Sequence, residues 1–125
     1  MISSTTSGFN NVVTHTDGAG TVNAAHCRAW VNFDGTAGTI SPRASFNVSS
    51  ITDNGSGDYT VNFSNAMSDA NYSASGTSAL NNTGNTWRIP TQMRPWTTTY
   101  SDWECIVTTT GAVADHEFVT LDFHR

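Results

Sequence analysis

The chain almost lacks the residues that build helices. It contains no Lys, and among its 125 residues only two are Leu, two are Glu and one is Gln. Thr, Ser, Asn and Gly together account for 56 residues. Straight-chain side chains favour helices, whereas Thr favours strands and Gly, Asn and Ser favour turns. This composition excludes helical bundles and doubly wound α/β folds, and it predicts an all-β protein.

Charge and hydropathy exclude several classes of partner. The charged fraction is 12% and the formal net charge is -5, which is too little charge for a disordered chain. The five Arg are scattered and the pI is about 5.0, so we expect no nucleic acid partner. No window approaches the ~20 apolar residues of a membrane span, and the first residues show no signal-peptide pattern. We therefore expect neither membrane insertion nor a signal peptide.

The pattern of the chain changes near residue 25. Residues 1–24 are rich in Ser, Thr, Asn and Gly, and we interpret them as a flexible or partner-held lead-in. From there to residue 125, alternating apolar and polar residues predict six to eight short strands in one domain. Pro42 lacks an amide proton and so predicts an edge strand or a break. Asn54-Gly55 predicts a tight hairpin. The fold class is therefore a single antiparallel β-sandwich or a barrel-like domain.

The alternation also predicts the core, as one side of each strand. The expected inward residues are Cys27, Ala29, Val31 and Phe33, then Ala44, Phe46 and Val48, then Tyr59, Val61 and Phe63, then Trp103, Cys105 and Val107, and finally Val119, Leu121 and Phe123. Two cysteines are too few for a disulfide scaffold, so we expect Cys27 and Cys105 to be free thiols in the core.

Four segments, in order over about 45 residues, carry a resemblance to a known family. They are the Ala-Trp-Val-Asn-Phe strand at 29–33, the Ser-Phe-Asn-Val-Ser-Ser-Ile strand at 45–51, the Asp-Asn-Gly-Ser-Gly-Asp-Tyr hairpin at 53–59 and the Ala-Met-Ser-Asp-Ala-Asn-Tyr loop at 66–72. The chain in these segments resembles the C-terminal domain at the ends of bacteriophage and prophage tail fibres. Residues 77–117 have no counterpart in the family pattern.

The resemblance implies a function as well as a fold. It implies a homotrimeric distal module of the virion, made in the cytoplasm of the bacterial host, that attaches the phage to the cell surface and has no enzymatic activity. The expected partner is a cell-surface glycan or an outer-membrane component. The alternative from another class is a purely structural virion module, such as a trimerisation, assembly or capsid decoration domain. A free-standing lectin ranks third, and an enzyme acting on surface polysaccharide ranks last.

Residues 80–103 are the segment with the chemistry of a binding site. Aromatic rings stack on sugars, while Arg and Asp bond hydroxyl or charged groups, and long loops commonly display such residues. The candidate ligand-binding residues are Trp87, Arg88, Arg94, Trp96, Tyr100 and Asp102. The alternative is that Trp87 and Trp103 belong to the core and Trp96 covers a subunit interface. Trp30 and Phe118 lie on outward faces and are the candidate interface residues.

The sequence pattern gives little support for a catalytic site or a metal site. Asp102 and Glu104 share one face of a strand, and such neighbouring carboxylates usually form a solvated face, not an acid and base pair. The four His residues lack the spacing of paired metal ligands. The segment Asp115-His-Glu reads as a turn. We therefore expect no enzyme, no cofactor and no metal.

Overall fold

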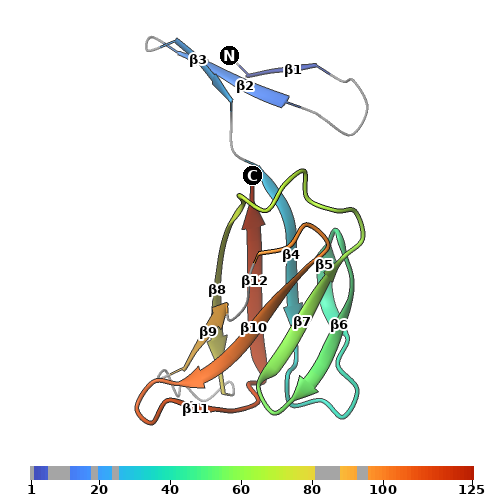
Figure 1. The fold of residues 1–125 in the computed structure, drawn as a ribbon. Coiled ribbons are helices and arrows are strands. Elements are labelled where there is room, and N and C mark those ends of the chain that lie inside the picture. Colours follow the sequence, from blue (N-terminus) through green and yellow to red (C-terminus); the bar gives the residue numbers. More distant parts are fainter. Residues whose placement is uncertain (1, 6–11, 18–19, 24–25, 81–87, 93–95) are drawn as a thin grey trace.

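The structure is a computed structural model that describes residues 2–5, 12–17, 20–23, 26–80, 88–92 and 96–125 (Figure 1). All of the regular structure in these ranges is β-strand, as the composition predicts. Within them, no helix has the length and hydropathy that crossing a bilayer requires.

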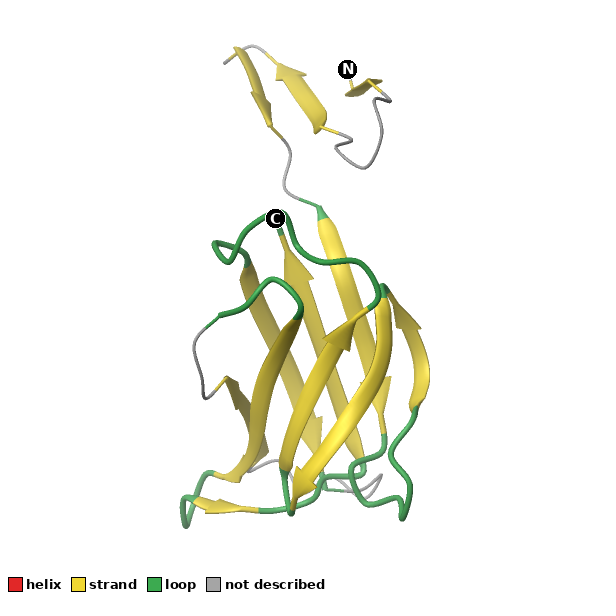
Figure 2. Cartoon of the chain, turned by 45° about the vertical axis from the view of Figure 1, so that its right-hand side comes forward, coloured by secondary structure: helices red, strands yellow, loops and turns green. Residues whose placement is uncertain are grey.

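A small three-stranded sheet forms within the first 24 residues. Its strands are β1 (Ile2–Thr5), β2 (Val12–Asp17) and β3 (Gly20–Asn23), and they pair antiparallel in that order. Both views place this sheet beyond one end of the main body of the chain (Figures 1 and 2). The segment that the sequence marked as a lead-in therefore contains strands of its own.

The main body consists of two antiparallel sheets that face each other (Figure 2). The first sheet has the order β5-β4-β12-β8. Its strands are β4 (Cys27–Phe33), β5 (Pro42–Phe46), β8 (Ser73–Ala79) and β12 (Phe118–His124). The second sheet has the order β11-β10-β7-β6, and β9 pairs with β10. Its strands are β6 (Val48–Gly55), β7 (Asp58–Phe63), β9 (Arg88–Gln92), β10 (Tyr100–Val107) and β11 (Ala112–Val113). The arrangement is consistent with a β-sandwich.

Period-two alternation places the core between the sheets. Buried and partly exposed positions alternate along β7 and along β12, as expected for strands with one covered face. The Phe123 ring packs edge to face against Phe63 and Trp103, at centroid distances of 5.0 Å and 6.1 Å. The expected inward positions of β4, β7, β10 and β12 are thus confirmed, with two exceptions, Cys27 and the partly exposed Val107.

The alternation reverses where the chain passes from the first sheet to the second. Asn47, between β5 and β6, has a φ of 53°, in the left-handed region. Its side-chain amide donates to the carbonyl oxygens of Arg28 and Asn65, which holds this crossing in place. Because of the reversal, Phe46 points outward and 55% of it is exposed. The predictions that Ala44 and Phe46 belong to the core are wrong, because both residues are exposed.

Cys27 also departs from its expected position. The pairing of β4 with β12 is regular up to Ala29 and Phe123, and then shifts so that Cys27 pairs with His124. This bulge inserts Arg28 and disturbs the alternation at the start of β4. Cys27 is exposed, and Cys105 is buried. Both are free thiols as predicted, but only Cys105 lies in the core.

The hairpin between β6 and β7 forms as predicted but turns two residues later. Its turn residues are Ser56 and Gly57, and the positive φ angles belong to Gly55 and Gly57, at 140° and 66°. A Cβ on Gly57 would lie 2.6 Å from the carbonyl oxygen of Ala114, so this position also requires glycine for space. Pro42 begins the edge strand β5, as its missing amide proton predicts.

The two ends of the sandwich differ. At the end we call the near end, His26 and Arg125 exchange two backbone hydrogen bonds of 3.2 Å and 3.0 Å. The loop 64–72 and the segment 96–99 lie at the same end, and the three-stranded sheet lies beyond it (Figure 1). The opposite, far end contains the 34–41 loop, the Ser56-Gly57 turn and the segments that flank β11.

Candidate binding surfaces

Six large apolar side chains are exposed among the described residues, and they form three groups. The exposed fractions are 39% for Trp30, 55% for Phe46, 47% for Ile89, 40% for Val113, 39% for Trp96 and 39% for Tyr100. Trp30 pairs with Phe46 across β4 and β5, and we call these two residues the aromatic pair. Ile106 pairs with both Ile89 and Val113, and we call these three residues the aliphatic row. Trp96 and Tyr100 form the third group.

Trp96 and Tyr100 lie at the near end, in and just after the segment that leads into β10. The Trp96 ring packs edge to face on Tyr72, with 4.8 Å between centroids, and the Tyr72 hydroxyl donates to the carbonyl of Thr97 over 3.1 Å. The Thr97 hydroxyl donates to the carbonyl of Tyr100 and accepts from its amide. Two partly exposed aromatic rings are therefore held on a fixed backbone.

A row of polar side chains continues from Tyr100 along the outer face of the second sheet. Tyr100 is opposite Asn62 and Asp102 is opposite Thr60 in the pairing of β10 with β7. The Thr60 hydroxyl donates to Asp102. The Asn62 amide donates over 3.0 Å to the hydroxyl of Thr52 on β6. Hydroxyl, amide and carboxylate groups thus lie side by side next to an exposed aromatic ring.

The structure places two of the six candidate ligand-binding residues, Tyr100 and Asp102, next to each other on the outer face of β10. Trp96 lies four residues before β10, and its ring packs on Tyr72. Tyr100 and Trp96 are partly exposed, whereas Asp102 is 7% exposed and already bonded to Thr60. The residues of the row that sequence reasoning missed are Thr60 and Asn62, which read only as outward positions of a strand.

Arg88 does not belong to that group. It pairs with Val107 at the opposite end of β10 from Tyr100, about 23 Å away at ~3.3 Å per residue. Its side chain lies inside, where Nη1 is 3.5 Å from His116 Nε2 and Nε has no hydrogen-bond partner. The other two candidates, Trp87 and Arg94, lie outside the described residues.

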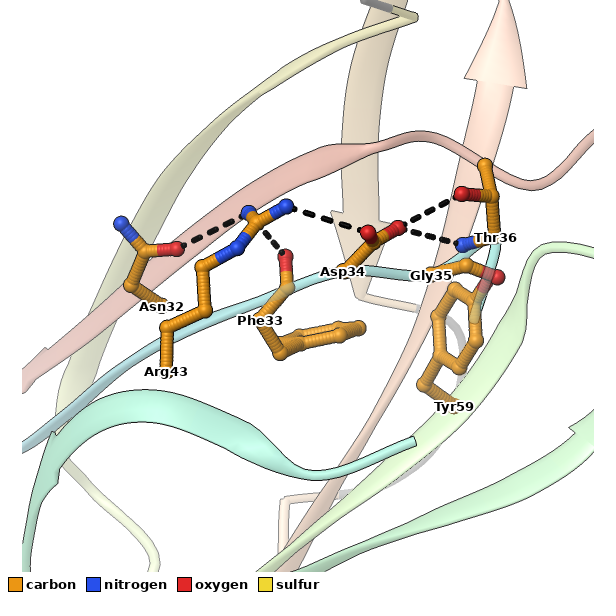
Figure 3. A network of polar contacts seen from close by, with 7 residues as sticks. All are labelled: Asn32, Phe33, Asp34, Gly35, Thr36, Arg43 and Tyr59. Carbon is orange, nitrogen blue, oxygen red and sulfur yellow. Dashed lines mark hydrogen bonds and ion pairs between the residues drawn. The ribbon is translucent and has the colours of Figure 1, made fainter. Parts of the chain in front are cut away.

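Of the candidate interface residues, Trp30 is exposed as expected and Phe118 is partly covered. The guanidinium of Arg43 lies 4.6 Å from the centroid of the Phe118 ring. Arg43 also donates to Asn32 Oδ1 and to the carbonyl of Phe33, and forms a 3.2 Å ion pair with Asp34 (Figure 3). The Arg43 guanidinium of the same chain therefore covers part of Phe118. The exposed aromatic residue that pairs with Trp30 is Phe46.

Asp34 is the centre of the polar contacts in the loop at the far end. Its Oδ1 accepts from both the amide and the hydroxyl of Thr36, at 2.9 Å and 2.7 Å (Figure 3). The hydroxyl of Thr36 is the main reason that the pKa of Asp34 is lowered, and the Arg43 cation adds to it. These bonds hold the start of the loop between β4 and β5 in one conformation.

Segments distant in sequence meet inside the far end. The Tyr59 hydroxyl lies 2.9 Å from the carbonyl oxygen of Gly35 and 2.8 Å from Asp115 Oδ1, and the Gly57 amide donates to the same Asp115 oxygen. Burial, then the hydrogen bond to Asp115, raises the pKa of Tyr59. The sequence read Asp115-His-Glu only as a turn, and no signal in the pattern pointed to this contact.

His116 follows Asp115 and is fully buried. Its Nδ1 lies 2.8 Å from the hydroxyl of Ser78. Burial and the neighbouring Arg88 cation lower the pKa of His116, so the neutral form is favoured. Burial raises the pKa of the Cys105 thiol to about 12. A buried thiol of this kind is a poor nucleophile, because the thiolate is the reactive form.

The other chemistry that the sequence raises is a metal site and a pair of carboxylates on one strand. In the ranges that the structure describes, no three His, Cys, Asp or Glu side chains gather in a way that could hold a metal ion. Asp102 and Glu104 share the outer face of β10, as expected, opposite Thr60 and Asp58. Comparison of the chain with protein-family models, with curated proteins and with solved structures finds no match.

Proposed function

We propose that this chain is a distal domain of a phage tail fibre that attaches the virion to its host by binding a cell-surface glycan. The observation that carries the proposal is the exposed Tyr100 ring beside the row formed by Asn62, Thr60 and Asp102. An aromatic ring can cover the apolar face of a sugar, while amide, hydroxyl and carboxylate groups bond its hydroxyls. The resemblance of residues 28–72 to fibre tips supports the same reading, and implies a homotrimer in the virion.

The near-end position of Trp96 supports a site formed by two rings. Trp96 lies four residues before Tyr100, and its ring is held against Tyr72. Rigid aromatic side chains lose little conformational entropy when a ligand binds, which suits weak and repeated attachment to a cell surface. The binding surface that we propose therefore consists of Trp96, Tyr100, Asn62 and the exposed oxygen atoms beside them.

Binding to isolated cell envelopes from a panel of bacterial strains tests this function. Envelopes are used untreated, after periodate oxidation of their sugars, and after protease digestion. We expect binding to envelopes of some strains, lost after periodate and retained after protease. Loss after protease alone would indicate a protein receptor and would overturn the glycan assignment.

Variants locate the site. Tyr100→Ala and Trp96→Ala are expected to weaken envelope binding at least tenfold, whereas Tyr100→Phe retains the ring and much of the binding. Thr108→Ala, at an exposed position of the far end, is the matched control and is expected to bind normally. Normal binding by Tyr100→Ala would place the ligand elsewhere.

The second candidate function is a purely structural virion module without a receptor. It is favoured by the aromatic pair and the aliphatic row, because exposed apolar surfaces of this kind are typical of protein interfaces. A structural module should bind envelopes of no strain in the panel, under any treatment. An enzyme has no comparable observation in its favour. The Tyr100 surface would suit a free-standing lectin equally, and the resemblance of residues 28–72 favours the fibre domain over it.

A further inference from the structure

Asn54 and Gly55 lie at the exposed tip of the hairpin between β6 and β7. Both residues are exposed, and so are Asp53 before them and Ser56 after them. The pairing of the two strands shifts between Asp53 and Gly55, so Asn54 is an extra residue that pairs with no residue of β7. Neither burial nor strand pairing therefore holds the Asn54 side chain in place.

The backbone nitrogen of Gly55 is open to reaction. Glycine has no Cβ that could shield its amide, and a Cβ placed on Gly55 would have no neighbour within 4 Å. The Gly55 amide donates to Asp53 Oδ1 over 3.0 Å. A carboxylate at this distance can accept the amide proton as a general base. The nitrogen that could attack and the group that could take its proton are thus already in contact.

The side chain of Asn54 supplies the carbon that this nitrogen can attack. An asparagine side chain and the backbone nitrogen of the next residue can close a five-membered ring, and the reaction is intramolecular. The Asn54 amide nitrogen donates to Thr60 Oγ1 over 2.9 Å and to Asp58 Oδ1 over 3.3 Å. Both bonds lie on the surface, where water can replace them. They involve the nitrogen that would leave, and they do not block the carbon.

We propose that Asn54 is a site of spontaneous modification, at which the folded chain converts this asparagine into aspartate and isoaspartate. The Gly55 nitrogen forms a bond to Asn54 Cγ, and its proton passes to the Asp53 carboxylate. The bond from Cγ to Nδ2 then breaks, and the departing nitrogen takes up that proton and leaves as ammonia. Water opens the resulting succinimide ring at either carbonyl, which gives aspartate or isoaspartate. The sequence of steps needs only water as a co-reactant.

The modification changes both the charge and the contacts of the hairpin tip. It replaces an amide that donates to Thr60 and Asp58 by a carboxylate, which can only accept. The new negative charge lies beside those of Asp58 and Asp53, and like charges repel. Thr60 also donates to Asp102, in the polar row on the outer face of the second sheet. An effect on that row, unlike the modification itself, matters for binding only if the proposed function holds.

Mass spectrometry of chymotryptic peptides tests the modification after long incubation of the folded chain in mildly alkaline buffer. We expect the peptide with Asn54 to exchange its amide for a carboxyl at least tenfold faster than Asn71, which is also exposed but precedes Tyr72. In Asp53→Asn the side chain still accepts the Gly55 amide but is a much weaker base, so the rate should decrease at least threefold. In urea, where the contact is lost, Asp53→Asn and the unchanged chain should react at the same rate.

Two outcomes of this experiment would overturn the proposal. An Asn54 that stays intact in the folded chain, while the chain in urea is modified, shows that the fold protects it. Equal rates for Asp53→Asn and the unchanged folded chain show that the carboxylate takes no part. These rates are measured without any ligand, so they stand or fall separately from envelope binding.

The consequence for the hairpin is tested with the product itself. Asn54→Asp should unfold at a lower urea concentration than the unchanged chain, because its new carboxylate faces those of Asp53 and Asp58. Thr108→Asp adds the same charge at an exposed turn position and is the matched control, with an unchanged midpoint. Equal midpoints for the two variants would overturn the effect on the hairpin.

Discussion

The hydroxyl of Tyr59 lies 2.8 Å from Asp115 Oδ1, although 56 residues separate the two in sequence. The same oxygen accepts the amide of Gly57 over 2.6 Å. This contact joins strand β7, the turn that precedes it and the segment before β12. It is a polar link between the two sheets at the far end.

Removing the hydroxyl should destabilise the fold. Tyr59→Phe removes a hydrogen-bond partner from the partly buried Asp115 carboxylate and from the buried carbonyl oxygen of Gly35, and we expect it to lower the free energy of unfolding by about 1–3 kcal/mol. Urea denaturation followed by tryptophan fluorescence measures the change. Tyr100→Phe removes an exposed hydroxyl and should stay within about 0.5 kcal/mol. Equal effects of the two changes would show that the Tyr59 contact contributes no special stability.

Stability should depend on pH through His116. Burial and Arg88 lower the pKa of His116 from the ordinary 6.5, so the unfolded chain takes up the proton more readily than the folded one. The contribution of His116 to the free energy of unfolding is therefore complete above about pH 6.5. It decreases as the pH falls from there toward the lower pKa of the folded state. The carboxyl of Asp34, whose pKa is lowered by the Thr36 hydroxyl, loses its contribution only in more acidic solution.

Urea denaturation at about pH 7.5, 6.5 and 5.5 measures this dependence. In His116→Gln the buried ring is replaced by an amide that does not titrate, and the decrease between these pH values should become smaller. A decrease of the same size in both proteins would assign it to other groups.

The two thiols should react very differently in the native protein. Cys27 is exposed, whereas Cys105 is fully buried and its pKa is raised to about 12. At about pH 8, an alkylating reagent should add one label to each native chain and two in denaturant, because Cys105 is buried and its raised pKa disfavours the reactive thiolate. Intact mass counts the labels, and Cys27→Ser should abolish the native one. Rapid labelling of both thiols in native conditions would contradict the buried position of Cys105.

Two phenylalanines that look alike in the sequence should differ in energetic importance. Phe63→Ala removes a ring packed between Tyr72 and Phe123 and is expected to cost roughly 3–5 kcal/mol. Phe46→Ala removes an exposed ring whose cross-strand partner is Trp30, and should cost less than about 1 kcal/mol in the single chain. Denaturation at a protein concentration low enough to keep copies apart measures both. Similar costs would place Phe46 in the core after all.

The part of the fold that depends on local alternation could be predicted from the sequence. The strands around Val31, Val61 and Leu121 were expected with the correct side inward, because one covered face of a strand leaves a period of two in the residues. The position of Phe46 could not be predicted in this way. It depends on the left-handed conformation of Asn47, which reverses the alternation without interrupting the polar and apolar pattern.

The candidate site was predictable only in part, for a related reason. Aromatic residues in a long segment pointed to Trp96 and Tyr100, and both are partly exposed. The same criterion also selected Arg88, which the pairing of β9 with β10 turns inward at the other end of the strand. Neighbours such as Asn62 and Thr60 join Tyr100 and Asp102 only through strand pairing, which composition and spacing do not reveal.

The pairing of His26 with Arg125 at the near end has a consequence for protein engineering. His26 and Arg125 exchange two backbone hydrogen bonds, so a short linker could join these positions without stretching the chain. New termini could then be opened in the exposed turn Thr108–Gly111, since breaks at exposed turns are usually tolerated. Such a circular permutant of residues 26–125 would present its far end to whatever it is fused to, and leave Trp96 and Tyr100 on the free side.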